Sequence, residues 1–195
     1  MSFGNFARKV RDPALPYRHR VSALRSCVQL YRPLGFQATL SFLELRAGRF
    51  QHDETALLNA LGVIEESRAA RQDEIMAYVA MRREAKRQGR RNPRQGDPNP
   101  YTQVRWYWYG APREAARHAL LFWLRRRSTG LQPLMTDPIL VELRQCASLC
   151  LEHDGELTAT ERRLLAPRVK ELEQHLQLWD LLQVIRHIEV AAGLR

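Results

Sequence analysis

Residues 53–87 read DETALLNALGVIEESRAARQDEIMAYVAMRREAKR, and this stretch decides the fold class. Asp53 is a natural helix N-cap with Glu54 beside it in the first turn, and the bases gather at the far end, as the helix dipole favours. Apolar side chains recur at the spacing of one helical face, at Leu57, Leu61, Ile64, Ile75, Tyr78 and Val79. We therefore predict one long helix that starts at Asp53 and fades near Gln88 and Gly89.

The same helical periodicity continues on both sides of this stretch. Before it, the pattern predicts a helix over residues 18–31, stopped by Pro33, and a second over residues 36–47, ended by Gly48. After it, the pattern predicts a helix from Pro112 to residues 125–127, one that opens with Asp137-Pro138, and a last one from near Thr160 or Pro167 to about Ala192. The sequence thus predicts an all-α protein.

A break in the pattern divides these helices into two groups. Residues 89–100 read GRRNPRQGDPNP, in which two glycines and three prolines forbid regular structure. Residues 104–109, VRWYWY, follow as a short strand or an extended aromatic arm. The predicted organisation is a basic N-terminal arm, a three-helix unit, an Arg/Pro-rich linker with the aromatic arm, and a C-terminal unit of about three helices, at residues 1–17, 18–88, 89–111 and 112–195.

Charge is carried almost wholly by arginine and alternates in sign along the chain. The chain has 28 Arg against 3 Lys and a formal net charge of +10. Residues 1–52 carry nine bases and two acids, and residues 82–127 carry thirteen bases and three acids. The stretches after each block, residues 53–81 and 128–195, are acidic on balance. Because guanidinium groups bind phosphate and carboxylate in pairs of hydrogen bonds, we expect two faces that bind acidic partners.

Several functional classes lack support in the sequence. The longest apolar run, residues 119–124, is far shorter than the roughly 18 residues of a membrane span. No Gly-rich phosphate loop, nucleophile elbow or His-Glu-x-x-His motif is present, so we expect a protein that is not an enzyme and has no intrinsic cofactor. Cys146, Cys150 and His153 follow one another at helical spacing and define a metal site only as a remote alternative to an ordinary half-buried face.

The second basic block also fits a nucleic-acid interface. Residues 82–94 carry seven bases and one acid, and four consecutive aromatic residues follow shortly after. Phosphates bind basic groups and unpaired bases stack on aromatic rings, so this segment favours single-stranded RNA as the alternative partner, in a ribosomal or viral accessory protein. The residues that would carry this binding are Arg90, Arg91, Arg94, Arg105, Trp106 and Trp108.

Leu30-Tyr31-Arg32 spells the tripeptide of the LYR family, the small basic three-helix proteins of mitochondria, and the chain resembles that family over about residues 18–101. Residues 45–50, LRAGRF, are similar to the ending of the family's second helix, and an acid-started third helix follows. Residues 97–101, DPNPY, look like the Pro-x-Pro-Tyr element of members that are accessory subunits of respiratory complex I. The resemblance implies a non-catalytic accessory subunit on the matrix side of the inner mitochondrial membrane.

The resemblance also implies a partner and the residues that meet it. LYR proteins hold the acidic helix of the mitochondrial acyl carrier protein on a basic helical face, while the acyl-phosphopantetheine of the carrier enters an apolar channel between their helices. Neighbouring subunits of the large complex would be further partners. The residues that would face the acidic helix are Arg25, Tyr31, Arg32, Arg46, Arg49 and Phe50. Those that would line the channel are Leu24, Val28, Phe36, Leu40, Leu43 and Leu61, which are equally typical of a plain core.

Overall fold

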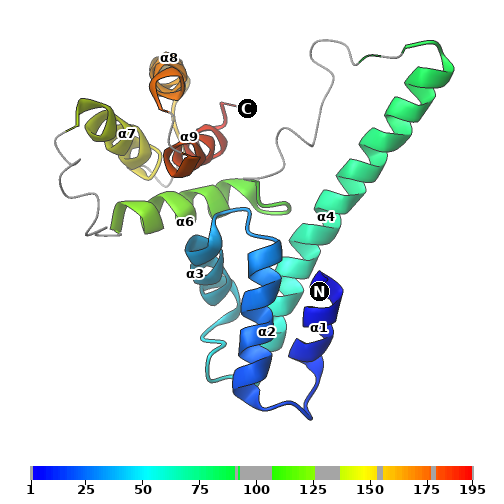
Figure 1. Ribbon diagram of the computed structural model, residues 1–195. Helices are drawn as coiled ribbons and strands as arrows, with labels where there is room; N and C mark the ends of the chain where they lie inside the picture. The colour runs from blue at the N-terminus through cyan, green and yellow to red at the C-terminus, as the bar shows by residue number, and fades with distance from the viewer. Residues whose placement is uncertain are drawn as a thin grey trace. The chain divides into compact units, whose positions relative to one another are not determined.

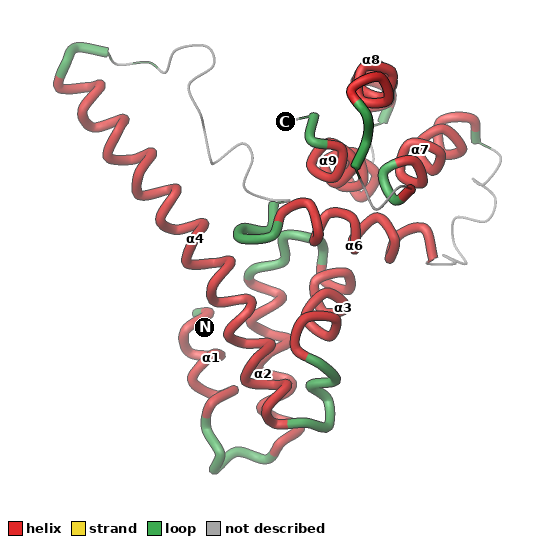
Figure 2. Tube along the Cα trace, turned by 180° about the vertical axis from the view of Figure 1, so that it is seen from behind, coloured by secondary structure: helices red, strands yellow, loops and turns green. Residues whose placement is uncertain are grey.

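The computed structural model describes residues 2–90, 92, 107–125, 137–152, 156–176 and 179–194. These residues form eight helices and no strand, so the all-α prediction is confirmed, as Figure 2 shows. The chain divides into two compact units, one made of residues 1–33 and 43–105 and the other of residues 34–42 and 106–195. None of the described helices is long and apolar enough to cross a membrane.

The first unit contains the helices that the N-terminal pattern predicts. They are α2 (Tyr17–Leu30), the C-terminal part of α3 (Phe36–Ala47) and α4 (Glu54–Arg87), labelled in Figure 1. The predicted N-cap of α4 is confirmed, because the Asp53 carboxylate accepts hydrogen bonds from the backbone N–H groups of Thr55 at 2.8 Å and Ala56 at 3.3 Å. Apolar residues from α2 and the first half of α4 fill the core of this unit, among them Leu24, Val28, Leu57, Leu61 and Ile64.

An additional helix lies at the N-terminus. The sequence predicts a basic arm over residues 1–17, whereas residues 3–11 form helix α1 (Phe3–Arg11), which packs beside α2 and α4. Phe3, Ala7 and Val10 share one face and are buried. The local sequence does indicate this helix, because the three residues recur at helical spacing and the Ser2 hydroxyl accepts a hydrogen bond from the Asn5 N–H at 3.4 Å. A nine-residue helix is nevertheless marginal in isolation, so its packing on α2 adds stability.

The second unit contains α6 (Pro112–Arg125), α7 (Pro138–Leu149), α8 (Ala159–His175) and α9 (Trp179–Ala192). The predicted start of α7 is confirmed, since the Asp137 carboxylate accepts a hydrogen bond from the N–H of Ile139 at 2.8 Å. All four helices contribute to one core, which includes Leu120, Leu143, Leu165, Val169, Ile185 and Ile188.

One predicted helix is two helices in the structure. The sequence predicts a single helix to about Ala192, but α8 ends at His175, Leu176 has extended backbone, and α9 begins at Trp179. The break has a physical reason, because the apolar stripe of the first half points in a different direction around the helix axis from the stripe of the second half. One continuous helix would not turn both stripes toward the same core. With two helices that pack on each other, both stripes face one core. The start of α8 is fixed by a capping box between Thr158 and Glu161.

Residues 34–42 belong to the second unit, although the sequence places them in the unit of residues 18–88. Gly35 enables the turn before α3 with a φ of +81°, a conformation that side chains rarely adopt. Within the second unit, Ser41 hydrogen-bonds His118 at 3.0 Å, and the rings of Phe42 and Trp108 meet edge to face at 4.8 Å between centroids. No local pattern indicates this pairing of segments that lie far apart in the chain.

Candidate functional site

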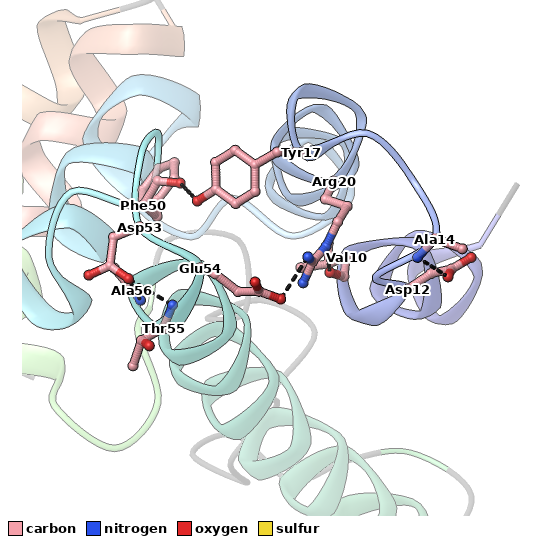
Figure 3. A network of polar contacts seen from close by, with 10 residues as sticks. All are labelled: Val10, Asp12, Ala14, Tyr17, Arg20, Phe50, Asp53, Glu54, Thr55 and Ala56. Carbon is pink, nitrogen blue, oxygen red and sulfur yellow. Dashed lines mark hydrogen bonds and ion pairs between the residues drawn. The ribbon is translucent and has the colours of Figure 1, made fainter.

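Two arginines of the first basic block form ion pairs within the first unit. Arg20 is only 4% exposed. Its Nε donates to the backbone carbonyl of Val10 at 2.8 Å, and its Nη1 donates to the Glu54 carboxylate at 2.7 Å, as Figure 3 shows. Arg11 forms a two-pronged ion pair with Glu65. Both pairs fasten α1 and α2 to α4, so this part of the charge is structural.

The remaining arginines of the predicted docking face are exposed. Arg25 and Arg32 project from α2 and from the residue after its C-cap, and Arg46 and Arg49 lie at the end of α3 and just beyond it. Arg18 is exposed as well and precedes Arg25 by seven residues, which is close to two full helical turns. Sequence reasoning passed over Arg18, although the seven-residue interval was visible. These five residues are called the arginine surface: Arg18, Arg25, Arg32, Arg46 and Arg49.

The two aromatic residues predicted to meet the acidic helix lie in the core. Tyr31 is 5% exposed, and its hydroxyl shares a hydrogen bond of 2.9 Å with Ser67. Burial raises the pKa of Tyr31. Phe50 is fully buried, and its backbone carbonyl accepts a hydrogen bond from the Tyr17 hydroxyl at 2.8 Å (Figure 3). Tyr31 and Phe50 therefore position the helices that carry the exposed arginines, while Leu30, which precedes Tyr31, is 52% exposed.

The predicted channel residues are divided between the units. Leu24, Val28, Leu43 and Leu61 are buried in the first unit, each at most 1% exposed. Leu40 is buried and Phe36 half-buried, and both belong to the second unit. In the first unit these side chains act as ordinary core, and an acyl chain would have to displace them to enter.

Little of the predicted RNA-binding set can be placed. Arg90 is exposed at the end of α4 and hydrogen-bonds Gln88 at 3.2 Å. Trp108 is 4% exposed and packed on Phe42, so its ring does not offer a face for stacking on a base. The other predicted residues, Arg91, Arg94, Arg105 and Trp106, lie outside the described residues.

The cysteines are buried thiols. Cys146 and Cys150 are fully buried on one side of α7, and His153 lies outside the described residues. Within the part of the chain that the structure describes, no cluster of three or more His, Cys, Asp or Glu side chains could hold a metal ion. Burial raises the pKa of Cys150 to about 12 and, in the first unit, that of Cys27 to about 12. Such thiols stay protonated and unreactive at neutral pH.

One buried histidine in the second unit is unusual. His187 on α9 is 3% exposed, and neither ring nitrogen has a hydrogen-bond partner among the described residues. Burial lowers its pKa to about 4, so the ring is neutral at physiological pH. Two residues on, burial raises the pKa of Glu189 to about 7, although Arg186 donates to its carboxylate at 2.8 Å. Protonation at low pH therefore destabilises the folded unit through His187 and stabilises it through Glu189.

A shallow groove of about 460 Å³ lies between α7 and α8. Its two guanidinium groups are already engaged, since Arg168 donates to Glu142 at 2.9 Å and Arg144 lies over the Trp123 ring. The lining offers no histidine or cysteine to act as base or nucleophile, so it suits surface contact better than chemistry. The lining residues are Val141, Arg144, Gln145, Ser148, Leu149, Glu152 and Arg168.

Comparison of the chain with protein-family models, with curated proteins and with solved structures gave no match. The chain is an all-α protein of two compact units, and the five arginines named above are exposed on the first.

Proposed function

We propose that this protein is a non-catalytic accessory subunit of a mitochondrial membrane-associated assembly of the respiratory complex I kind, and that it holds the acyl carrier protein on its arginine surface. The observation that carries the proposal is the division of the first basic block. Arg11 and Arg20 are ion-paired within the fold, and the unit exposes Arg18, Arg25, Arg32, Arg46 and Arg49. A folded surface of this kind is suited to a rigid acidic partner.

The chemistry of the surface favours a helix with carboxylates as the partner. Arg18 and Arg25 stand about 10 Å apart along the helix axis, since each residue advances by about 1.5 Å. Carboxylates spaced at two turns on an opposing helix would match this interval. Leu30, two residues before Arg32, is 52% exposed and adds apolar area there. The LYR-like tripeptide and the Pro-x-Pro-Tyr-like element direct the choice of partner to the mitochondrial carrier.

Binding to the purified acyl carrier protein tests this proposal. The variant Arg25→Glu/Arg32→Glu should bind roughly 30-fold more weakly, because two exposed ion pairs are lost and replaced by repulsion, worth about 2 kcal/mol together. Affinity of the unchanged chain should fall as salt rises. The matched control is Arg163→Glu, which reverses an exposed charge on α8 in the second unit. Equal loss in the control, or no binding by the unchanged chain, would refute the proposal.

A second measurement addresses the acyl chain. Because Leu24, Val28, Leu43 and Leu61 are fully packed, binding of the carrier through charge alone needs no change in the core. If the chain enters between the helices, the acylated carrier should bind more tightly than the carrier with bare phosphopantetheine. It should also speed hydrogen exchange of amides around Leu24. Identical affinities for the two forms would limit the proposal to the surface interaction.

A further inference from the structure

Helix α4 has a buried first half and an exposed second half. Most of its buried residues lie between Ala56 and Ser67, and in the rest of the helix only Ala85 is buried. Arg71 on α4 still contacts this part of the unit, since its guanidinium lies over the ring of Tyr31, the C-cap residue of α2. Beyond this point α4 continues past α1 and α2 for several turns, as Figure 1 shows. The second half is therefore a helix with little covering from the other helices of its unit.

This second half nevertheless carries an apolar stripe. Three apolar residues lie on one side of the helix, with one polar residue before them and one after them at matching intervals. The set is called the distal α4 face and consists of Gln72, Ile75, Met76, Val79 and Arg83. Met76 is 63% exposed, while Ile75 and Val79 are half-buried. Helices in proteins are stabilised mainly by burying such a stripe. The spacing is also that of the anchors with which a helix enters an apolar groove on another protein.

The C-terminal end of the distal α4 face carries positive charge. Arg83 is followed by Lys86 and Arg87 on nearly the same side, all exposed. The only acid in these last turns is Glu84, which points away and accepts hydrogen bonds from Arg87 at 3.3 Å and Gln88 at 2.9 Å. A groove that receives this face is therefore expected to be apolar along its length and to carry carboxylates at one end.

A second copy of the chain fits this face poorly. In an antiparallel pair centred on Met76, Arg83 would lie opposite Ala69, and Arg87 would lie opposite Glu65, whose carboxylate is already ion-paired with Arg11. Lys86 would lie level with Glu66 but on the opposite flank of the pair. In a parallel pair, Arg83 would lie opposite its own counterpart. Each chain also carries a net charge of +10, which opposes association of copies. The charge pattern thus favours a different, acidic partner.

We propose that the distal α4 face is a docking helix, which inserts Ile75, Met76 and Val79 into an apolar groove with carboxylates at one end on a neighbouring protein. This interface is separate from the arginine surface, because it uses another helix segment and rests on apolar anchors. It does not depend on the acyl carrier protein being the partner there.

Site-specific photocrosslinking of the full chain in its native cells tests the proposal. A photoreactive amino acid at Met76 should crosslink to a different protein, at a mapped site lined by apolar residues with Asp or Glu at one end. The control position is Ala77, exposed and about 100° around the helix, which should give little of this product. Crosslinks confined to this chain, to a second copy or to nucleic acid would overturn the proposal, as would equal crosslinking from both positions.

Two substitutions then measure the interface with the crosslinked protein. Met76→Asp should weaken binding about 30-fold or more, since a carboxylate would be buried without a partner in the groove. Arg83→Glu should weaken it roughly tenfold and reduce its salt dependence. Asp73→Asn, on another side of the same helix turn, is the matched control and should bind as the unchanged chain does. Because these positions are exposed, each variant should fold, as circular dichroism can verify. Unchanged affinity in Met76→Asp would refute the proposal.

Discussion

Replacing Arg20 by Met is the sharpest probe of how the first unit is held together. The change keeps an unbranched side chain in the core but removes the hydrogen bond to the Val10 carbonyl and the ion pair with Glu54. A buried hydrogen bond to a charged group contributes about 1.5–3 kcal/mol. The ion pair adds less, because the Glu54 side chain is 56% exposed and solvent screens it. The expected loss of unfolding free energy is about 2–3 kcal/mol.

The assay must separate the two units, because a chain with two cores need not unfold in one step. All four tryptophans lie at positions 106–179, in the second unit, so their fluorescence reports that unit during urea unfolding. Hydrogen exchange of the α1 and α2 amides reports the first. In Arg20→Met these amides should exchange about 30- to 150-fold faster under conditions of fast reclosing. The fluorescence transition should stay where it is.

The matched control is Arg18→Met, an exposed position on the same helix, for which we expect a change below about 0.5 kcal/mol. Equal exchange rates in the two variants would refute the view that Arg20 fastens α1 to α2. A shift of the fluorescence transition in Arg20→Met, with α1 exchange unchanged, would refute it as well.

Three further predictions concern groups elsewhere in the chain. The folded pKa of His187, about 4, lies below its unfolded value, so the second unit should lose about 3 kcal/mol of unfolding free energy through this group between about pH 6.5 and 4. The folded pKa of Glu189, about 7, lies above its unfolded value, so this group should add stability as pH falls from 7 to 4.5. Fluorescence-detected melts should therefore show acid lability in Glu189→Gln and acid stabilisation in His187→Phe; the same pH profile in both would contradict the assignment. The three cysteines should resist a thiol reagent at pH 8 in the native chain and react fully in denaturant, and rapid native labelling would show that they are accessible. Gly35→Ala should destabilise the second unit by about 1 kcal/mol or more, because the φ of Gly35 is +81°. Gly62→Ala in α4 should stabilise the first unit by about 0.5–1 kcal/mol, because an added Cβ meets nothing within 4 Å there. Equal effects of the two substitutions in urea titrations would refute this explanation from backbone conformation.

The sequence shows where the basic residues cluster, and the structure shows which of them are buried and which are exposed. The block of charge at residues 1–52 is visible in the sequence, but sequence reasoning treats its members as equals. Arg20 is in the core and Arg25, on the same helix, is exposed. Their separation of five residues places the two side chains on different sides of α2, and only the packing of α1 decides which side is buried. The sequence thus predicts that exposed arginines are present in this block, but not which of the arginines are exposed.

Local chemistry determined the helices. Asp53, Asp137 and the stops after α2 and α3 act through hydrogen bonds and steric limits within a few residues, so the sequence alone determined an all-α chain and most helix starts. Tertiary structure alone decided the rest. It broke the last predicted helix into α8 and α9 and joined residues 34–42 to the second unit. These outcomes depend on which apolar surfaces meet across long stretches of chain, and burial of that kind leaves no mark on short-range sequence pattern.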